Sequence, residues 1–290
     1  GIGGSDASII AGCNPYCSIF ELWQEKRGEI PVKEEESEVI HFGKVLEDVV
    51  RKEFIQRTGL MVRKKNSILR SKEYPFMIAD VDGIISELDG TYSIFEAKTA
   101  IEFKNNDWKN GEIPKAYQLQ VQHYLAVTGF QKAYIAVLVG GNKFYWTEVY
   151  RDEQLIKMLV SMESHFWHCV REGEEPDVDA SKATSLYLGA KYNNAKVGSV
   201  IDLDEQMLSA IEKYEQIKIE LDSLTEKKRL VENQLKSALA ENEAGRVGGH
   251  IVKWKQVVQT RIDSSKLKEK HKDIYDDCKK EVIYRKFSVA

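Results

Sequence analysis

The Asp89-Gly90 pair lies between two strand-like runs and places the strongest constraint on the fold of this 290-residue chain. An Asp-Gly pair in that position predicts a β-hairpin, because glycine adopts a positive φ at no steric cost. The arms of the hairpin are expected to be residues 76–82 and 92–97, which alternate or run apolar. The middle of the N-terminal region is therefore predicted to contain antiparallel strands.

Helical and strand-like patterns alternate on both sides of this hairpin. Helical periodicity covers residues 18–26, 41–57, 113–128 and 153–172, and further strand-like runs cover 61–69, 133–139 and 143–150. This order predicts an α/β core, with a mixed central sheet flanked by helices, within residues 1–176. Glycine and proline near residue 176 close the last helix of this core.

The remainder of the chain divides into two regions of different composition. Residues 177–245 are predicted to hold a linker and a long helix, whose apolar residues recur mostly at steps of three and four from Met207 to Ala238. This apolar stripe indicates either packing against the chain's own tail or an intermolecular coiled coil. Residues 246–290 read as a small basic α+β module, with a strand at 251–254, a helix at 264–279 and strand-like residues at 282–289.

Composition narrows the class of protein. Hydrophobic residues make up 42% and charged residues 30%, which is typical of a soluble globular protein. The longest apolar stretch, 133–139, is far shorter than the roughly 20 residues of a membrane helix, so no membrane association is expected. The four cysteines lack the spacing of a zinc ribbon or a grouped iron–sulfur site, and reduced thiols in a cytoplasm are expected.

The net charge is −4, yet the charges are unevenly distributed along the chain. Residues 246–290 contain 12 Lys and Arg against 6 Asp and Glu, so the C-terminal module is locally basic. The net charge of the chain argues against a uniformly basic surface, but it is compatible with a local basic path that binds phosphates.

Carboxylates occupy unusual positions on the two arms of the predicted hairpin. Alternation along 76–82 places Asp80 and Asp82 on one face, and alternation along 94–98 places Glu96 and Lys98 on one face. A strand that buries Ile94 beside Glu96 must give that carboxylate a partner, because an unpaired buried charge costs several kcal/mol. The partner would be a divalent cation shared with Asp82, or the ammonium group of Lys98.

This combination of residues suits phosphodiester chemistry. Mg²⁺ prefers carboxylate oxygens and stabilises charge on phosphoryl oxygens, and a lysine two residues further on can position the attacking water. The pattern therefore indicates a metal-dependent phosphodiesterase. A surface hairpin whose acids and lysine face solvent is the alternative that the spacing alone leaves open.

Two helices add candidate residues. Glu47 interrupts an otherwise apolar helical stripe that includes Val50 and Phe54. It is either an acid at the edge of the stripe or a third carboxylate that helps to orient a metal ion. In the helix around 115–124, Gln120 and Tyr124 are four residues apart and share a face. His123 lies off that face and is expected at the surface.

Several of these residues occur together with other short motifs. In chain order, the set is the opening Gly1-Ile2-Gly3-Gly4-Ser5-Asp6-Ala7-Ser8, the segment 15–23, Gly43-x-x-x-Glu47, Asp82-Gly83, Glu96-x-Lys98 and Gln120-x-x-x-Tyr124. As a set, over about residues 1–150, they closely resemble the YqaJ-type viral recombinase family. This family is the phage lambda-exonuclease-like branch of the PD-(D/E)XK nucleases. The implied fold is a restriction-endonuclease-like α/β core.

The resemblance implies roles for individual residues. Asp82, Glu96 and the Ala97 carbonyl would bind metal, with Glu47 supporting that site or a second ion. Lys98 would assist the attacking water, and Gln120 would position Lys98 or the phosphate.

A second implied group would contact DNA or its 5′-phosphate, and consists of Ser5, Tyr124 and Gln118. For Ser5, the cap of a helix N-terminus is an equally good interpretation.

The implied activity is Mg²⁺-dependent digestion of linear double-stranded DNA from 5′ to 3′, with one or two ions per site and Mn²⁺ as an alternative ion. Such digestion leaves 3′ single-stranded tails for a phage single-strand annealing protein, in the cytoplasm of a bacterial host that carries the phage or prophage. By the same resemblance, the protein is expected to form a homo-oligomer, as a trimeric ring around the duplex. A structure- or site-specific DNA endonuclease and a non-catalytic DNA-binding or scaffold protein remain as alternatives.

Overall fold

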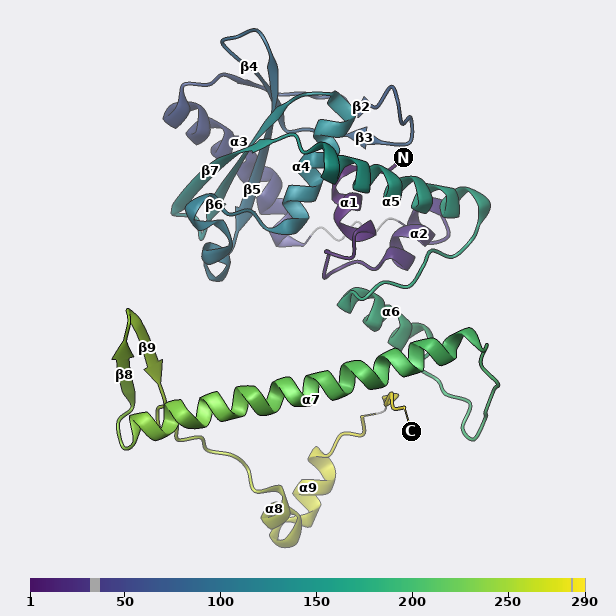
Figure 1. Ribbon diagram of the computed structural model, residues 1–290, viewed down its shortest axis with the longest axis vertical. Helices are drawn as coiled ribbons and strands as arrows, with labels where there is room; N and C mark the ends of the chain where they lie inside the picture. The colour runs from purple at the N-terminus through teal and green to yellow at the C-terminus, as the bar shows by residue number, and fades with distance from the viewer. Residues whose placement is uncertain (32–36, 283, 290) are drawn as a thin grey trace. The chain divides into compact units, whose positions relative to one another are not determined.

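A computed structural model describes residues 1–31, 37–282 and 284–289 of the chain (Figure 1). The chain forms two compact units, Gly1–Tyr192 and Asn193–Ala290. The first unit holds all the candidate site residues. The division of the chain at residues 176 and 245, made from composition, stays a prediction.

The first unit is built on a five-stranded sheet in the order β1-β4-β5-β6-β7. Its strands are β1 (Val62–Arg63), β4 (Gly83–Ser86), β5 (Tyr92–Ala100), β6 (Lys132–Val139) and β7 (Lys143–Tyr150). The β5–β6 pair is parallel, with Glu96 opposite Ile135, and the other pairs are antiparallel. A parallel pair needs a long crossover. The 3₁₀ segment η1 (Glu102–Gly111) and helix α4 (Lys115–Thr128) supply it.

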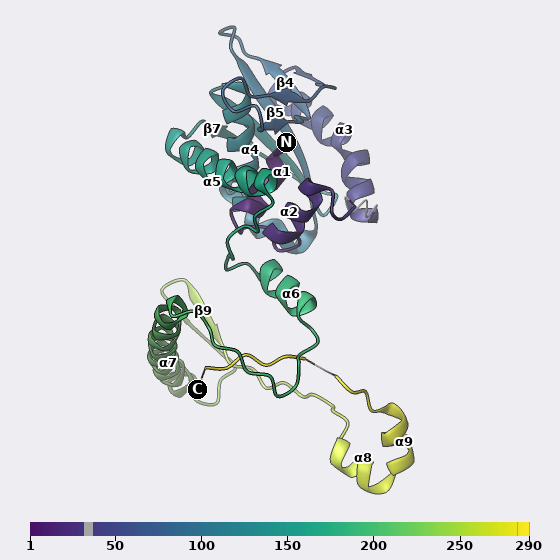
Figure 2. The same ribbon diagram turned by 90° about the vertical axis from the view of Figure 1, so that its right-hand side faces the viewer.

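Helices cover both faces of this sheet. Figure 2 shows α3 (Glu38–Thr58) on one side of the strands, and α4 and α5 (Glu153–Glu172) on the other. Helices α1 (Gly4–Ile10) and α2 (Ile19–Arg27) pack against the α4 and α5 side. The helix ends follow local sequence, because Ser18 caps α2, Asp152 caps α5, and Gly59 ends α3 at φ 74°. The mixed α/β core expected from the sequence is confirmed.

Strand β5 separates the two apolar layers by alternation. Phe95 packs with Val50 and Phe54 of α3, whereas Ile94 packs with Val121 and Leu125 of α4. Glu96 follows the same alternation as Ile94 and is only 2% exposed. The polar groups of β5 therefore face α4 inside the protein.

The hairpin closes at Asp89-Gly90, with Gly90 at φ 83°, but one of its predicted arms is wrong. The partner of β5 is β4, with Gly83 opposite Phe95, and not the run 76–82. Only Ile78–Ala79 of that run forms a strand (β3), which pairs with β2 (Leu69–Arg70) in a separate small sheet. The single strand expected at 61–69 is likewise divided between β1 and β2. Their pairing partners come from distant sequence, which local alternation cannot indicate.

Alternation nevertheless describes the side chains of this run. Met77, Ala79 and Val81 are at most 2% exposed, whereas Asp80 faces solvent. The parallel bridge between Ile2 and Met77 holds the run against the start of the chain. Among the described residues, three helical segments were not predicted from periodicity, namely α1, η1 and α6 (Lys182–Lys191). In α6, Tyr187 stacks on Phe20 with 5.2 Å between ring centroids.

The second unit contains the predicted long helix as α7 (Gln206–Leu239). Its apolar stripe is exposed, with Leu221 57% and Leu224 59% accessible. A small hairpin, β8 (Ala244–Val247) and β9 (His250–Lys253), follows it. The helix expected at 264–279 is broken at His271 into α8 (Ser264–Lys270) and α9 (Lys272–Cys278). Residues 282 and 284–289 form no strand, and residue 283 of that prediction lies outside the described residues.

Within the described residues, the four cysteines form no disulfide. Among the described residues, none of the helices combines the length and apolar character that crossing a membrane requires.

Candidate active site

Asp82 lies immediately before β4 and reaches across to β5. Its Oδ2 accepts a hydrogen bond of 2.8 Å from the backbone N–H of Ala97. The next residue, Gly83, permits the close packing of β1 against β4, because a Cβ there would lie 2.5 Å from Cγ1 of Val62 and 3.2 Å from the carbonyl oxygen of Arg63. The Asp82-Gly83 pair therefore fixes one carboxylate beside the strand that carries Glu96.

Glu96, Lys98 and Gln120 form a hydrogen-bonded cluster between β5 and α4. The ammonium of Lys98 donates to Oε1 of Glu96 at 2.6 Å, and Nε2 of Gln120 donates to the same oxygen at 2.9 Å. The Gln120 amide also lies 2.9 Å from the hydroxyl of Tyr124. One carboxylate oxygen thus receives two donors from two different elements.

Lys98 is held from a second direction by aromatic rings. Its Nζ lies 4.9 Å from the ring centroid of Tyr117, and that ring stacks on Trp108. A cation above an aromatic face is attracted by the ring quadrupole. The lysine is therefore oriented by α4 and η1 as well as by its own strand.

The other carboxylate oxygen of Glu96 has no partner. Its Oε2 is buried and makes no hydrogen bond within the described part of the chain. An unsatisfied buried carboxylate oxygen is costly, and such atoms in native proteins usually indicate a missing ligand or a functional role. Glu96 therefore presents one free oxygen to whatever binds next to it.

Negative charge accumulates around this oxygen. Burial and the neighbouring carboxylate of Glu96 raise the pKa of Asp82 to about 7, against the opposing hydrogen bond from Ala97. Burial and the charge of Asp82 also raise the pKa of Glu47, on α3. Burial alone would lower the pKa of Lys98, but Glu96 raises it above its ordinary value, so the lysine stays charged. One lysine does not balance this group of acids.

A solvent-accessible cavity of about 400 Å³ opens onto the carboxylates of Glu47 and Asp82. Glu47, Asp80 and Asp82 line one part of it, and Lys64 and Lys65 line another. Strand alternation predicts that Asp80 shares a face with Asp82, but it gives Asp80 no role. We refer to this space as the carboxylate cavity.

Comparison with known proteins identifies the family. Residues 1–131 match the family model of the YqaJ-like viral recombinase domain. Over 292 aligned residues the chain is 44% identical to the protein YqaJ of Bacillus subtilis (strain 168). The alignment covers 100% of this chain and 91% of that protein. The chain belongs to the YqaJ-like viral recombinase family.

The fold of this YqaJ-like chain is similar to that of an alkaline exonuclease, LHK-Exo, from Laribacter hongkongensis. The match to its crystal structure has a TM-score of 0.50 and 19% identity, and covers 59% of this chain and 88% of that one. The crystal structure of LHK-Exo in complex with dAMP gives a TM-score of 0.49 and 20% identity over the same shares of the two chains.

The predicted site residues of this YqaJ-like protein separate into two groups. Asp82, Glu96, Lys98, Gln120 and Tyr124 are linked by the contacts above, and Ala97 and Glu47 adjoin them. Ser5 and Gln118 are not part of that network. Gln118 is exposed, two residues from Gln120 and therefore on another side of α4.

Ser5 is exposed inside the first turn of α1, and its carbonyl accepts a bond from Ser8. It is therefore not the helix cap. The cap position is Gly3, whose N–H donates to Asp6 at 2.7 Å.

The expectation of a surface position for His123 is wrong. His123 is 0% exposed, and its Nδ1 lies 2.9 Å from Oε1 of Glu163 on α5. Its Nε2 lies 2.9 Å from the carbonyl oxygen of Ile78 on β3. Helical periodicity separated His123 from the Gln120 face correctly, but it could not show that α5 covers the other face.

A close contact between Gly4 of α1 and α4 yields a stability prediction. A Cβ at Gly4 would lie 2.4 Å from Cε1 of Tyr124 and 3.0 Å from Cγ of Gln120. We expect Gly4→Ala to lower the free energy of unfolding by about 1–3 kcal/mol, the usual cost of overpacking. Denaturant unfolding measures this change. Gly189→Ala in α6, where a Cβ meets nothing within 4 Å, is the control and should not be destabilising. Equal stability of both variants would contradict the close contact.

Proposed function

We propose that this YqaJ-like protein is a metal-dependent exonuclease that hydrolyses the phosphodiester bonds of linear double-stranded DNA. The observation that carries the proposal is the unpartnered Oε2 of Glu96, buried beside Asp82 and next to a charged lysine. Family membership supports a role in viral recombination, and the fold match to an exonuclease is consistent with it.

The residues present fit a hard divalent cation. Among the described residues, no three His, Cys, Asp or Glu side chains converge on one point, so an all-protein cage is absent. Mg²⁺ usually takes one or two carboxylates and completes its shell with water and substrate phosphate. Asp82, Glu96 and the carbonyl of Ala97 would hold Mg²⁺, or Mn²⁺ in its place, with Glu47 available to support that ion or a second one. When bound, such an ion stabilises negative charge on phosphoryl oxygens and lowers the pKa of a coordinated water.

The protein's own residues supply orientation and positive charge. Lys98 keeps its proton and points toward Glu96, where its ammonium can stabilise a phosphate and position the attacking water. Gln120 fixes the Glu96 carboxylate by its hydrogen bond to Oε1, which leaves Oε2 free. Tyr117 limits the movement of Lys98 from the other side. The cluster is thus preorganised before substrate binds.

The direction of digestion and the partners belong to the same proposal. Degradation from 5′ to 3′ would leave a 3′ single strand, which is the substrate of a single-strand annealing protein. We propose such a protein as the partner in phage-type recombination. We also propose that the chain acts as a homo-oligomer, with a trimer around the duplex as the form to test by light scattering.

A linear duplex labelled at either end tests this proposal. With Mg²⁺ we expect loss of the strand from its 5′ end, faster with a 5′-phosphate, and no digestion in chelator. A closed circular duplex of the same sequence should remain intact, because it offers no end. Calorimetry should show Mg²⁺ binding to the parent and its loss in a Glu96→Gln variant.

Two outcomes would contradict the proposal. Cleavage of the closed circle would indicate an endonuclease that uses the same site. Binding of DNA without any cleavage in Mg²⁺ or Mn²⁺ would indicate a non-catalytic DNA-binding protein.

A further inference from the structure

A second hollow, of about 540 Å³, lies next to the carboxylate cavity and has a different character. Its residues come from β2 and the turns beside it, from β4 and from the end of α4. We define this basic groove by six of its lining residues: Lys65, Leu69, Arg70, Lys72, Ile84 and Phe130.

The three cations of the basic groove are free to bind a ligand. Lys65, Arg70 and Lys72 form no ion pair and no side-chain hydrogen bond with any residue in 1–31, 37–282 or 284–289. By contrast, the adjacent Lys64 is paired with Asp48 at 2.6 Å. Glu73 also lines the groove, and it accepts a hydrogen bond from the hydroxyl of Tyr74. The groove therefore has an excess of positive charge, which complements a chain of phosphates.

The basic groove continues from the carboxylate cavity. Lys65 lines both spaces, so the two hollows meet at this side chain. A nucleic acid strand that reaches the carboxylate cavity at Lys65 can continue into the groove without leaving the surface.

The floor of the groove favours an unpaired strand. Leu69, Ile84 and Phe130 are half-buried and add apolar surface to the lining of the groove, where one face of the Phe130 ring stacks on Tyr92 with 5.9 Å between ring centroids. Bases can lie against such a floor only when they are not paired, because the bases of a duplex face each other. Basic side chains combined with an aromatic surface are typical of single-strand binding.

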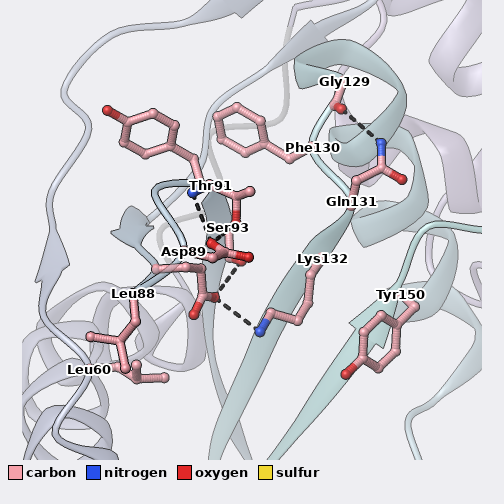
Figure 3. Close-up of a pocket in the computed structure, with 12 residues that line it drawn as sticks. Leu60, Leu88, Asp89, Thr91, Ser93, Gly129, Phe130, Gln131, Lys132 and Tyr150 are labelled. Carbon is pink, nitrogen blue, oxygen red and sulfur yellow. Dashed lines mark hydrogen bonds and ion pairs between the residues drawn. The ribbon is translucent and has the colours of Figure 1, made fainter.

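The groove ends at Phe130. A larger hollow of about 680 Å³ shares Gly129 and Phe130 with it, and Figure 3 shows Phe130, Lys132 and Asp89 around this space. Glu87 and Asp89 line it together with Lys132, and Lys132 is already paired with Glu87 at 3.1 Å. Two acids and one paired lysine do not attract phosphates, so a strand would leave the surface near Phe130.

We propose that the DNA strand left intact by the enzyme continues past the carboxylate cavity along the basic groove, with its phosphates on Lys65, Arg70 and Lys72 and its bases against Leu69 and Phe130. This inference rests on the proposed exonuclease function. An exonuclease consumes one strand up to the site, so an unpaired strand that continues beyond the site is the complementary one. The groove therefore selects duplexes that carry a 3′ single-stranded tail.

The test compares a triple variant, Lys65→Ala, Arg70→Ala and Lys72→Ala, with the parent. Binding is measured by fluorescence anisotropy, in chelator, on a single strand, a duplex with a 3′ tail and a blunt duplex. We expect the variant to bind the single strand and the tailed duplex at least about tenfold more weakly, and the blunt duplex nearly as well as the parent. The slope of log affinity against log salt should become shallower by about 2, because each single-strand phosphate contact contributes roughly 0.7.

The matched control removes three exposed cations from α5 and α6, by Lys157→Ala, Arg171→Ala and Lys182→Ala. These residues line none of the hollows described above. The control variant should bind all three DNAs as the parent does.

Phe130 is tested separately with Phe130→Ala and Phe130→Tyr. The alanine variant should bind the single strand about tenfold more weakly, whereas the tyrosine variant should retain binding because stacking on a ring is preserved. Circular dichroism of each variant confirms that the fold is intact.

Unchanged affinity and slope in the groove variant would overturn the inference, and so would an equal loss for blunt duplex and single strand. These results are separate from the test of the proposed function. If the parent cuts linear DNA and the triple variant binds single-stranded DNA as the parent does, the role of the basic groove is refuted and the proposed nuclease function is not. If the triple variant binds tailed DNA more weakly than the parent but the parent never cuts DNA, the proposed nuclease function is refuted and the role of the basic groove is not.

Discussion

Lys98→Ala should reduce hydrolysis of linear duplex DNA by about a thousandfold, within the range observed when a positioned catalytic group is removed. The reason is geometric and electrostatic. Lys98 is the cation bonded to Oε1 of Glu96, the carboxylate whose second oxygen, Oε2, is unpartnered. Without it, both the charge that stabilises the phosphate and the donor that orients water are lost. Single-turnover digestion at saturating Mg²⁺ measures the effect.

Lys132 provides a matched control for this substitution. It too is a partly buried lysine, paired with Glu87 and lying 4.7 Å from the ring centroid of Tyr134. Lys132→Ala should lose a comparable amount of stability but retain digestion within a few-fold of the parent. A Lys98→Ala protein that folds and digests DNA at the parental rate would refute the site assignment.

His123→Ala should lower the free energy of unfolding by about 3–5 kcal/mol, because it leaves Glu163 as an unpaired buried group. Both side chains are 0% exposed, and both nitrogens of His123 face acceptors, Glu163 and the Ile78 carbonyl. The double variant His123→Leu with Glu163→Leu should recover much of this loss, since it removes both polar partners. Denaturant unfolding of the three proteins checks the prediction, and a double variant less stable than His123→Ala would contradict it.

The His123–Glu163 pair also predicts how the stability of the protein depends on pH. Burial alone would lower the pKa of His123, but the hydrogen bond and charge of Glu163 raise it above the ordinary value of 6.5. A raised histidine pKa stabilises the folded state fully below the unfolded pKa, and the contribution is lost as pH rises through the folded value. The parent should therefore lose stability above about pH 6.5 relative to the leucine double variant. Equal pH dependence of the two proteins would show that His123 is not the titrating group.

Much of the candidate site could be predicted because it depends on local rules. Glu96 and Lys98 share a strand face by alternation, and Gln120 and Tyr124 share a helix face by periodicity. The buried position of Ile94 beside Glu96 implied a partner for the carboxylate, and the structure provides Lys98 and Gln120 for one of its two oxygens. These relations need no knowledge of tertiary contacts.

The errors concern contacts between segments that are distant in the sequence. Asp82 was assigned to a strand arm, yet the pairing of Gly83 with Phe95 places it just before β4. His123 was assigned to the surface, because nothing in its own helix indicates the Glu163 carboxylate on α5. The basic groove was likewise not predicted as a hollow, since its walls come from three segments that only the folded chain brings together.

The parallel pairing of β5 with β6 has a consequence for the order of folding. Lys98 lies opposite Val137 in this pair, and residues 101–131 must form the crossover before the two strands can meet. Non-local pairing of this kind forms late, because the entropy of closing the intervening segment is lost first. A chain whose synthesis has not reached Val139 therefore lacks the complete strand that pairs with the backbone of β5 at Lys98. The ribosome releases the β6 residues after all the candidate site residues, so the candidate site stays unformed until β6 has paired with β5.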